Sequence, residues 1–166
     1  MKPPGYRSRF TQWIVAPLNA ELMRGAAPDK LAWTIAVGVV LGIFPIMGST
    51  TLLCILVSFF LRLNQIVVQV FKSLVYPLHL ALILVFIRLG EKLNGAPMIT
   101  LSVPQLVARF KENPMNFARE FGLAAWHGIT AWALIAPLLA VLIKLAVLPA
   151  LSAWRARLNA SRELAS

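Results

Sequence analysis

The sequence predicts an all-α fold: a small polytopic bundle of membrane helices, some of them broken by proline and glycine. The chain has 166 residues, of which 59% are hydrophobic and 13% are charged, whereas a soluble domain carries about 25% charged residues. Its mean hydropathy is +0.76. Residues 31–61 contain no charged side chain but hold Gly38, Gly42, Pro45 and Gly48 in their middle. These observations indicate an integral membrane protein of one domain.

The apolar run 31–61 is too long for one membrane crossing and too short for two. As a continuous α-helix it would be roughly 46 Å long, at about 1.5 Å per residue, whereas a bilayer core is about 30 Å thick. We therefore predict a break near residues 44–48, where two half-helices meet inside the membrane. Gly42 and Pro45 are the predicted break residues. Pro45 lacks the backbone N–H of a helix interior, and Gly48 tolerates the backbone angles of a break.

Residues 1–27 form a basic amphipathic lead. Their apolar side chains recur at three- and four-residue spacing, which is typical of a helix lying in the cytoplasmic membrane interface. Pro17 interrupts this pattern, so the alternative is a flexible tail with a few anchoring aromatic side chains. A new helix is expected to begin at Pro28, because proline suits the first turn and Asp29 suits the positive helix end.

The membrane domain is expected to span residues 28–154. Its second broken region, residues 63–93, is interrupted by Lys72 and by a kink at Pro77. Each broken region contains an aromatic–proline pair, a faint internal repeat of the kind found in transporters with broken helices. We predict that the first region is re-entrant and that the second crosses the membrane.

A polar interlude, residues 94–120, precedes the transmembrane helix predicted over residues 121–143. A short helix is expected to begin at Ser102 within the interlude. The transmembrane helix is long enough to cross a bilayer, and its one ionisable side chain is His127. After an extension of this helix, residues 155–166 form a basic cytoplasmic tail. With both termini in the cytoplasm, the number of crossings is even.

The formal net charge of +10 is concentrated at the ends of the apolar runs. This distribution is what the positive-inside bias of membrane proteins produces. It indicates anionic headgroups of membrane lipid as the partner, since acidic headgroups attract Lys and Arg next to the membrane. Nucleic acid is not expected as a partner.

The predicted break offers a candidate substrate-binding site. A half-helix that begins at Gly48 would point its first N–H groups and the positive end of its dipole into the membrane, where they favour phosphate or carboxylate. Lys72 has no carboxylate in the apolar runs to neutralise it, and such a cation is costly in lipid. The alternative is that Ser49 and Thr50 merely cap the helix and Lys72 extends to an interface. The candidate binding residues are Gly48, Ser49, Thr50, Thr51, Arg62, Asn64, Lys72 and His79.

The sequence predicts no catalytic, metal or cofactor site. Cys54, His79 and His127 do not show the spacing of a zinc site. The acidic residues lie outside the apolar runs, which argues against a proton relay with a buried carboxylate and against paired-carboxylate hydrolysis. We therefore expect a protein that is not an enzyme.

The spacing Gly38-x-x-x-Gly42 permits two helices to approach closely. We interpret it as a packing surface between the two broken regions of one chain. The alternative is a seam between two copies in a homodimer.

Several motifs in the apolar regions are distinctive in combination. They are Arg24-Gly25, Ala36-Val37-Gly38, Gly42-Ile43-Phe44-Pro45-Ile46, Leu61-Arg62-Leu63-Asn64-Gln65 and Leu74-Val75-Tyr76-Pro77-Leu78. Together they resemble a bacterial membrane-protein family catalogued as domain of unknown function 2062, over roughly residues 24–150. The resemblance implies a small multi-pass protein of the bacterial inner membrane without an established activity.

From the residues we expect a protein that binds or translocates an anionic amphipathic substrate, either lipid-linked or phosphate-bearing, without covalent chemistry. The alternative is a non-transporting membrane scaffold or accessory subunit whose basic ends bind a partner or a lipid surface.

Overall fold

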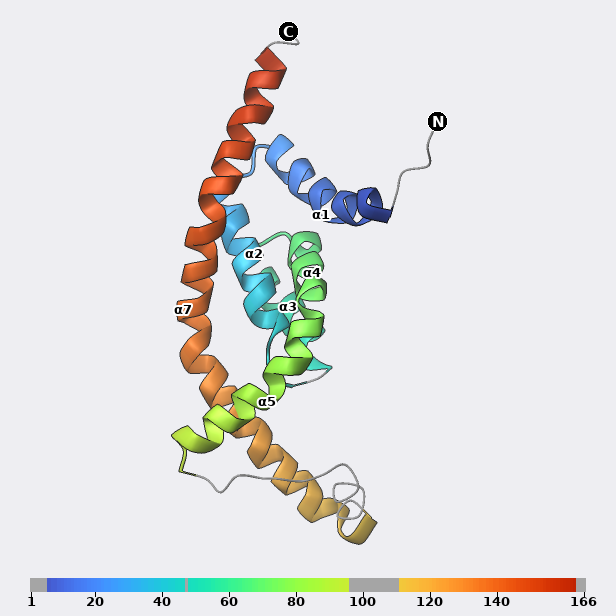
Figure 1. Cartoon of the computed structure of the whole chain (residues 1–166), viewed down its shortest axis with the longest axis vertical. Coiled ribbons are helices and arrows are strands. Elements are labelled where there is room, and N and C mark those ends of the chain that lie inside the picture. Colours follow the sequence, from blue (N-terminus) through green and yellow to red (C-terminus); the bar gives the residue numbers. More distant parts are fainter. Residues whose placement is uncertain (1–5, 47, 96–110, 164–166) are drawn as a thin grey trace.

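The computed structural model describes residues 6–46, 48–95 and 111–163, and this part of the chain is helical and free of strands (Figure 1). Its helices are α1 (Tyr6–Met23), α2 (Pro28–Gly42), α3 (Ser49–Phe60), α4 (Gln65–Leu74), α5 (Tyr76–Leu93) and α7 (Pro114–Glu163). The all-α prediction is therefore confirmed. The helix expected to begin at Ser102 lies outside the described residues, as does much of the polar interlude.

The long helix α7 extends along the molecule, and α2 and α5 pack against it (Figure 1). Near the start of α2, Lys144 Nζ lies 2.7 Å from Asp29 Oδ1. Near the end of α2, the indole N–H of Trp132 donates to the carbonyl of Val40 at 3.1 Å. Residue numbers rise along α2 as they fall along α7, so the two helices are antiparallel.

By length and composition, the segment Phe121–Ala160 of α7 is suited to crossing a membrane. Helices α4 and α5 pass the same test together as a pair bent by 69°, which gives two spans if the pair acts as one. Helix α7 extends beyond the predicted span of 121–143 at both ends, and it remains helical through Pro137 and Pro149. The expected tail from residue 155 is likewise helical as far as Glu163.

The predicted break in the first apolar run is confirmed, because α2 ends at Gly42 and α3 begins at Ser49. Gly48 precedes α3 with a φ of +86°, a left-handed conformation that glycine adopts without steric cost. Pro45 is buried, and a Cβ at Gly128 of α7 would lie 3.3 Å from the Cβ of Pro45. The break is therefore held against α7.

Helices α2 and α3 form a hairpin of two half-helices. They contain 15 and 12 residues and are about 22 and 18 Å long, so each is shorter than a bilayer core of about 30 Å. The turn after α3 returns to the start of α2, where Arg62 and Lys30 line the same cavity. Both ends of the hairpin therefore lie at one end of the bundle.

The second apolar region also bends near the predicted kink. Helix α4 ends at Leu74 and α5 begins at Tyr76, with Pro77 in the first turn of α5, where its missing N–H costs no helical hydrogen bond. Helix α4 begins at an Asn64 cap, whose side-chain Oδ1 accepts a hydrogen bond from the Val67 N–H at 3.0 Å.

The two glycines of the Gly-x-x-x-Gly spacing allow α2 to pack closely on α4. A Cβ at Gly38 would lie 2.8 Å from the carbonyl oxygen of Val68, and a Cβ at Gly42 would lie 2.6 Å from Val75 Cγ2. The motif therefore serves packing within one chain, as the sequence interpretation preferred. A homodimer stays a prediction, and it gains no support from these glycines.

Helix α1 is continuous through Pro17, so the expected interruption is absent. Leu18 is buried and Ile14 is partly buried in a cluster that also contains Leu31 of α2 and Leu151 of α7. These contacts hold the turns on either side of the proline against one surface, which offsets the backbone hydrogen bond that proline removes. The basic lead thus packs on the bundle near the C-terminal turns of α7.

Candidate functional site

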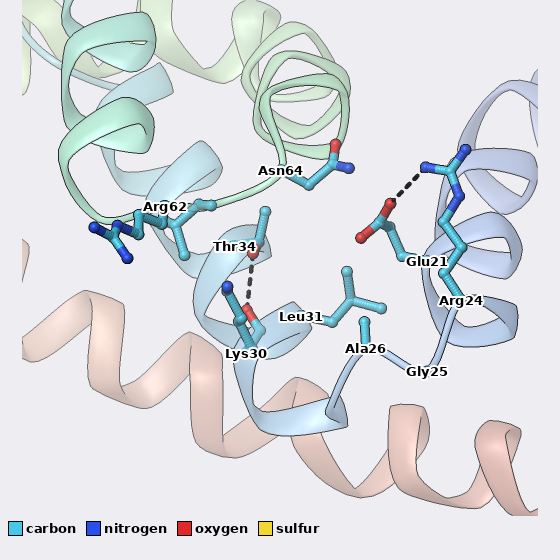
Figure 2. Close-up of a pocket in the computed structure, with 10 residues that line it drawn as sticks. Glu21, Arg24, Gly25, Ala26, Lys30, Leu31, Thr34, Arg62 and Asn64 are labelled. Carbon is cyan, nitrogen blue, oxygen red and sulfur yellow. Dashed lines mark hydrogen bonds and ion pairs between the residues drawn. The ribbon is translucent and has the colours of Figure 1, made fainter.

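A cavity of about 420 Å³ lies where the α1–α2 loop, the first turns of α2 and the α3–α4 turn meet (Figure 2). We call it the basic cavity. Its charged and polar side chains come from Glu21, Arg24, Lys30, Thr34, Arg62 and Asn64.

The basic cavity carries an excess of positive charge. Three cations and one carboxylate line it, which leaves an excess of two positive charges. Arg24 Nη1 lies 3.3 Å from Glu21 Oε1, so these two side chains neutralise each other (Figure 2). Lys30 and Arg62 are exposed and belong to none of the ion pairs between described residues. They are the two lining cations without a carboxylate partner among the described residues, and the guanidinium of Arg62 points outward, away from Glu21 and Asn64 (Figure 2).

Arg62 occupies a backbone position that usually favours glycine. Its φ is +51°, and it is the one non-glycine residue with positive φ in the described ranges. The N–H of Leu63 donates to the carbonyl of Ser58 at 2.8 Å, as in the Schellman motif that ends many helices. An arginine here costs on the order of 1 kcal/mol relative to glycine. Strain of this kind is concentrated at functional sites.

The walls of the basic cavity are fixed by hydrogen bonds to the backbone. Thr34 Oγ1 donates to the Lys30 carbonyl at 2.8 Å. Arg155 of α7 donates from Nη1 to the carbonyl of Ala26 at 3.3 Å, which ties the α1–α2 loop to α7. Asn64 lines the cavity and also caps α4, so it has a structural role at this position.

The helix break forms a second polar region. Lys72 Nζ donates to Thr51 Oγ1 at 2.8 Å, which joins the end of α4 to the first turn of α3. Ser49 Oγ donates to the carbonyl of Ile46 at 3.0 Å, and α3 has no side-chain hydrogen bond at its N-cap. Lys72 forms no ion pair with the described residues. The hydroxyl of Thr51 is therefore the polar partner of Lys72 at the break.

His79 packs in the interior beside the break. The residue is 2% exposed, and its backbone N–H donates to the carbonyl of Val75 at 2.8 Å. Its ring stacks on Tyr76, with ring centroids 6.0 Å apart. The Nδ1 atom is buried and has no hydrogen-bond partner in the structure. His79 is thus a buried side chain in the first turn of α5 with an unsatisfied ring nitrogen.

The predicted binding residues separate into two groups at opposite ends of α3. Arg62 and Asn64 line the basic cavity, and the others are placed around the break. Helix α3 has 12 residues and is about 18 Å long, so the two groups do not share one cavity. The residues around the break are Gly48, Ser49, Thr50, Thr51, Lys72 and His79. Ligand binding by either group stays a prediction.

Sequence reasoning missed most of the basic cavity. Arg24 and Lys30 flank the start of α2, and this clustering of charge was the one signal that pointed to them. By itself, this clustering indicates contact with lipid headgroups. The sequence also gave no sign that Glu91 is fully buried, with its Oε2 3.1 Å from Arg88 Nη1. In the described ranges, no three His, Cys, Asp or Glu side chains are placed to hold a metal ion.

The chain matches one family model over residues 11–159, and that family is described as an uncharacterized protein conserved in bacteria (DUF2062). The matched range contains both the basic cavity and the helix break. The resemblance inferred from the motifs is therefore confirmed. No curated protein and no solved structure matches the chain.

Proposed function

Because the chain belongs to the DUF2062 family of uncharacterised bacterial proteins, we propose a function from the geometry of its own residues. The protein is a multi-pass component of the bacterial cytoplasmic membrane that binds the phosphate-bearing headgroup of an anionic amphiphile in the basic cavity. It acts by binding, without covalent chemistry, and is not an enzyme. The observation that carries the proposal is the pair of unneutralised cations, Lys30 and Arg62, in a cavity at one end of an apolar bundle.

Helix α7 supports the placement of the basic cavity at a membrane surface. Residues 121–143 of α7 are about 34 Å long, close to the thickness of a bilayer core. At their C-terminal end, Lys144 pairs with Asp29 and lies 5.1 Å from the ring centroid of Trp33. Tryptophan and lysine are typical of the membrane–water interface. The start of α2, and with it the basic cavity, then lies in that interface.

Positions measured along α7 from Lys144 also support a re-entrant hairpin. Trp132 binds the end of α2 and Gly128 contacts Pro45. These α7 residues are 12 and 16 positions before Lys144, which corresponds to about 18 and 24 Å along the helix. The break is thus about two thirds of the way through a bilayer core of about 30 Å. The hairpin enters from the surface that holds the basic cavity and returns to it.

The arrangement of the chain ends supports a cytoplasmic basic cavity. Helix α1 and the last turns of α7 lie at the end of the molecule where α2 begins (Figure 1). Eight of the 16 lysines and arginines belong to α1, the α1–α2 loop, the first turn of α2, the α3–α4 turn and the last turns of α7. The positive-inside bias then assigns this end to the cytoplasm.

The chemistry of the two free cations favours phosphate. A guanidinium such as that of Arg62 can donate two parallel hydrogen bonds to phosphate oxygens, and the ammonium of Lys30 adds a compact positive charge. A phosphodiester in a lipid headgroup and free inorganic phosphate share this chemistry. Because the basic cavity lies in the membrane interface, it contacts lipid headgroups. The lipid phosphodiester is therefore the proposed ligand.

The proposal is tested by native mass spectrometry of purified protein with dioleoyl phosphatidylglycerol and dioleoyl phosphatidylcholine. Wild type should prefer the anionic lipid, and Lys30→Gln and Arg62→Gln should each weaken its binding about tenfold, since a hydrogen bond to a charged group contributes about 1.5–3 kcal/mol. Lys92→Gln is the matched control, because Lys92 is exposed on α5, away from the basic cavity.

Inorganic phosphate added as a competitor separates the two sources of the ligand. If it leaves lipid binding intact, the lipid headgroup is the ligand. Displacement of the lipid by millimolar phosphate would assign the cavity to the free anion. Equal binding of both lipids by wild type, or unchanged binding by both cavity variants, would contradict the proposal.

A scaffold or accessory subunit is the second candidate, and one observation favours it. The exposed Arg157 lies in the part of α7 that extends past the basic cavity, where a partner could dock. Truncation after residue 156 removes Arg157 and the rest of this extension but retains the Arg155 contact with Ala26. Loss of function in the truncated protein with intact anionic-lipid binding would favour the scaffold.

A further inference from the structure

Helix α4 carries three polar side chains on one face. Gln65, Gln69 and Lys72 are spaced by four and three residues, so they lie one above another along the helix. Gln65 Nε2 donates to the carbonyl of Ile55 at 2.9 Å, and Lys72 Nζ donates to Thr51 Oγ1 at 2.8 Å. Both acceptors belong to α3, so this face of α4 is turned toward α3. We call Thr51, Gln65, Gln69 and Lys72 the polar seam.

The polar seam has unmet hydrogen-bonding capacity. Gln65 Oε1 and Gln69 Nε2 are buried and have no hydrogen-bond partner in the structure. Lys72 forms no ion pair with the described residues. Inside a bilayer such groups need water, a ligand or a protein partner, because hydrocarbon offers none. The polar seam can therefore form further hydrogen bonds with water or with a polar ligand.

The polar seam connects the two sites described above. Asn64, which lines the basic cavity, immediately precedes Gln65. At the other end, the Cα of Lys72 would lie 3.1 Å from a Cβ at Gly42, the last residue before the break. Helix α4 has 10 residues and is about 15 Å long. The seam thus leads from the membrane surface to the depth of the break.

The polar seam is bordered by side chains suited to lipid. Leu52 and Phe59 of α3 are 61% and 73% exposed, and Ile66 of α4 is 65% exposed. An amphiphile beside α3 and α4 could keep its acyl chains against these side chains while its headgroup follows the seam. Beyond the bend, Tyr76 at the start of α5 is 52% exposed and continues the polar residues.

We infer that the polar seam is a hydrated route by which an anionic phospholipid headgroup leaves the basic cavity and moves through the membrane, so that the protein exchanges lipid between the two leaflets. The inference rests on the proposed function, because the cavity supplies the headgroup. Lys72 provides a positive charge beside the helix break, where a phosphate inside the membrane requires one. The exchange is passive and follows the lipid gradient.

The test uses the full chain in liposomes that contain a trace of fluorescent nitrobenzoxadiazole-labelled phosphatidylglycerol. Dithionite added outside destroys the label in the outer leaflet, so loss beyond about half of the signal reports exchange. Lys72→Met and Gln69→Leu should slow exchange about tenfold, whereas Lys72→Arg should keep most of it. Lys92→Met and Gln12→Leu are the matched controls, since both residues are exposed and outside the seam.

Lipid binding measured in parallel separates this inference from the proposed function. Lys72→Met and Gln69→Leu should bind phosphatidylglycerol as wild type does, whereas Arg62→Gln should lose both binding and exchange. Wild-type protein that binds the lipid but does not exchange it would overturn the seam and leave the cavity assignment intact. Exchange that persists in Arg62→Gln despite lost binding would overturn the link between the two.

Cysteine labelling tests the hydration of the seam directly. In a Cys54→Ala background, Gln69→Cys should react with a charged, water-soluble methanethiosulfonate, because the reagent requires a wet path. Leu56→Cys, on the exposed apolar face of α3, should react far more slowly. Equal, slow labelling of the two positions in folded protein would overturn the inference.

Discussion

Gly90 and His127 bring the backbones of α5 and α7 into direct contact. A Cβ at Gly90 would lie 1.8 Å from the carbonyl oxygen of His127 and 2.3 Å from its carbonyl carbon. The crossing is reinforced by Asn94, whose Nδ2 donates to Thr130 Oγ1 at 3.1 Å. The orientation of the bent α4–α5 pair on α7 therefore depends on the absence of a side chain at position 90.

Substitution of Gly90 by alanine should destabilise the protein strongly. The added methyl group meets backbone atoms that cannot move alone, so the helices must separate, and overpacking of this kind costs about 1–3 kcal/mol or more. The check is the melting temperature of the purified protein in detergent. Gly122→Ala in α7 is the control, since nothing lies within 4 Å of a Cβ there. Equal melting temperatures for both variants would contradict the close crossing.

Arg62→Gly should separate stability from binding. Glycine adopts the positive φ of this position without strain, so the variant should be as stable as wild type or more stable, by up to about 1 kcal/mol. Removal of the guanidinium should nevertheless weaken phosphatidylglycerol binding as Arg62→Gln does. Thermal unfolding and native mass spectrometry on the same sample make the comparison. A variant that loses stability and keeps its lipid would show that Arg62 has a purely structural role.

The ion pair between Asp29 and Lys144 should contribute little to the free energy of unfolding. Its expected role is to fix the position of α2 on α7. Asp29 is 57% exposed at its side chain, and exposed ion pairs contribute about 0–1 kcal/mol. Asp29→Asn and Lys144→Gln should therefore each lower stability only slightly. A double-mutant cycle on thermal stability measures the coupling between them. Coupling well above that range would indicate that the pair is shielded from water. The pair would then lie inside the membrane rather than at its surface.

Gly48→Ala should destabilise the hairpin for a backbone reason alone. Nothing lies within 4 Å of a Cβ at Gly48, but its φ is +86°, which costs an alanine on the order of 1–2 kcal/mol. Gly48→Asn should be milder, because asparagine tolerates left-handed conformations better than alanine. The melting temperatures of the two variants test this order. If alanine were tolerated as well as asparagine, the break would not depend on this conformation.

Two features of the fold followed from local rules. The mismatch between the length of the apolar run and a bilayer predicted a break, and Pro45 and Gly48 located it. The kink predicted at Pro77 corresponds to the bend between α4 and α5. Such features depend on the identity of a few neighbouring residues and on the rise of a helix, both of which are visible in the sequence.

Other features were mispredicted or missed because they depend on distant contacts. Pro17 was expected to interrupt α1, yet packing on α2 and α7 keeps the helix continuous. Glu91 lies in a charged stretch that suggests exposure, but it is fully buried where α5 crosses α7. In each case contacts from another helix outweighed the local preference.

The sequence by itself determined the helical class, the apolar character and the position of both bends, because these follow from composition and from the backbone limits of proline and glycine. The tertiary structure alone decided where the charged side chains meet. Arg62 is far from Arg24 and Lys30 in the chain, and the three share a cavity because α3 folds back beside α2. Close packing of α4 on α2 at Gly38 and Gly42 holds the turn between α3 and α4 beside the start of α2, and packing between segments is set by three-dimensional fit rather than by local pattern.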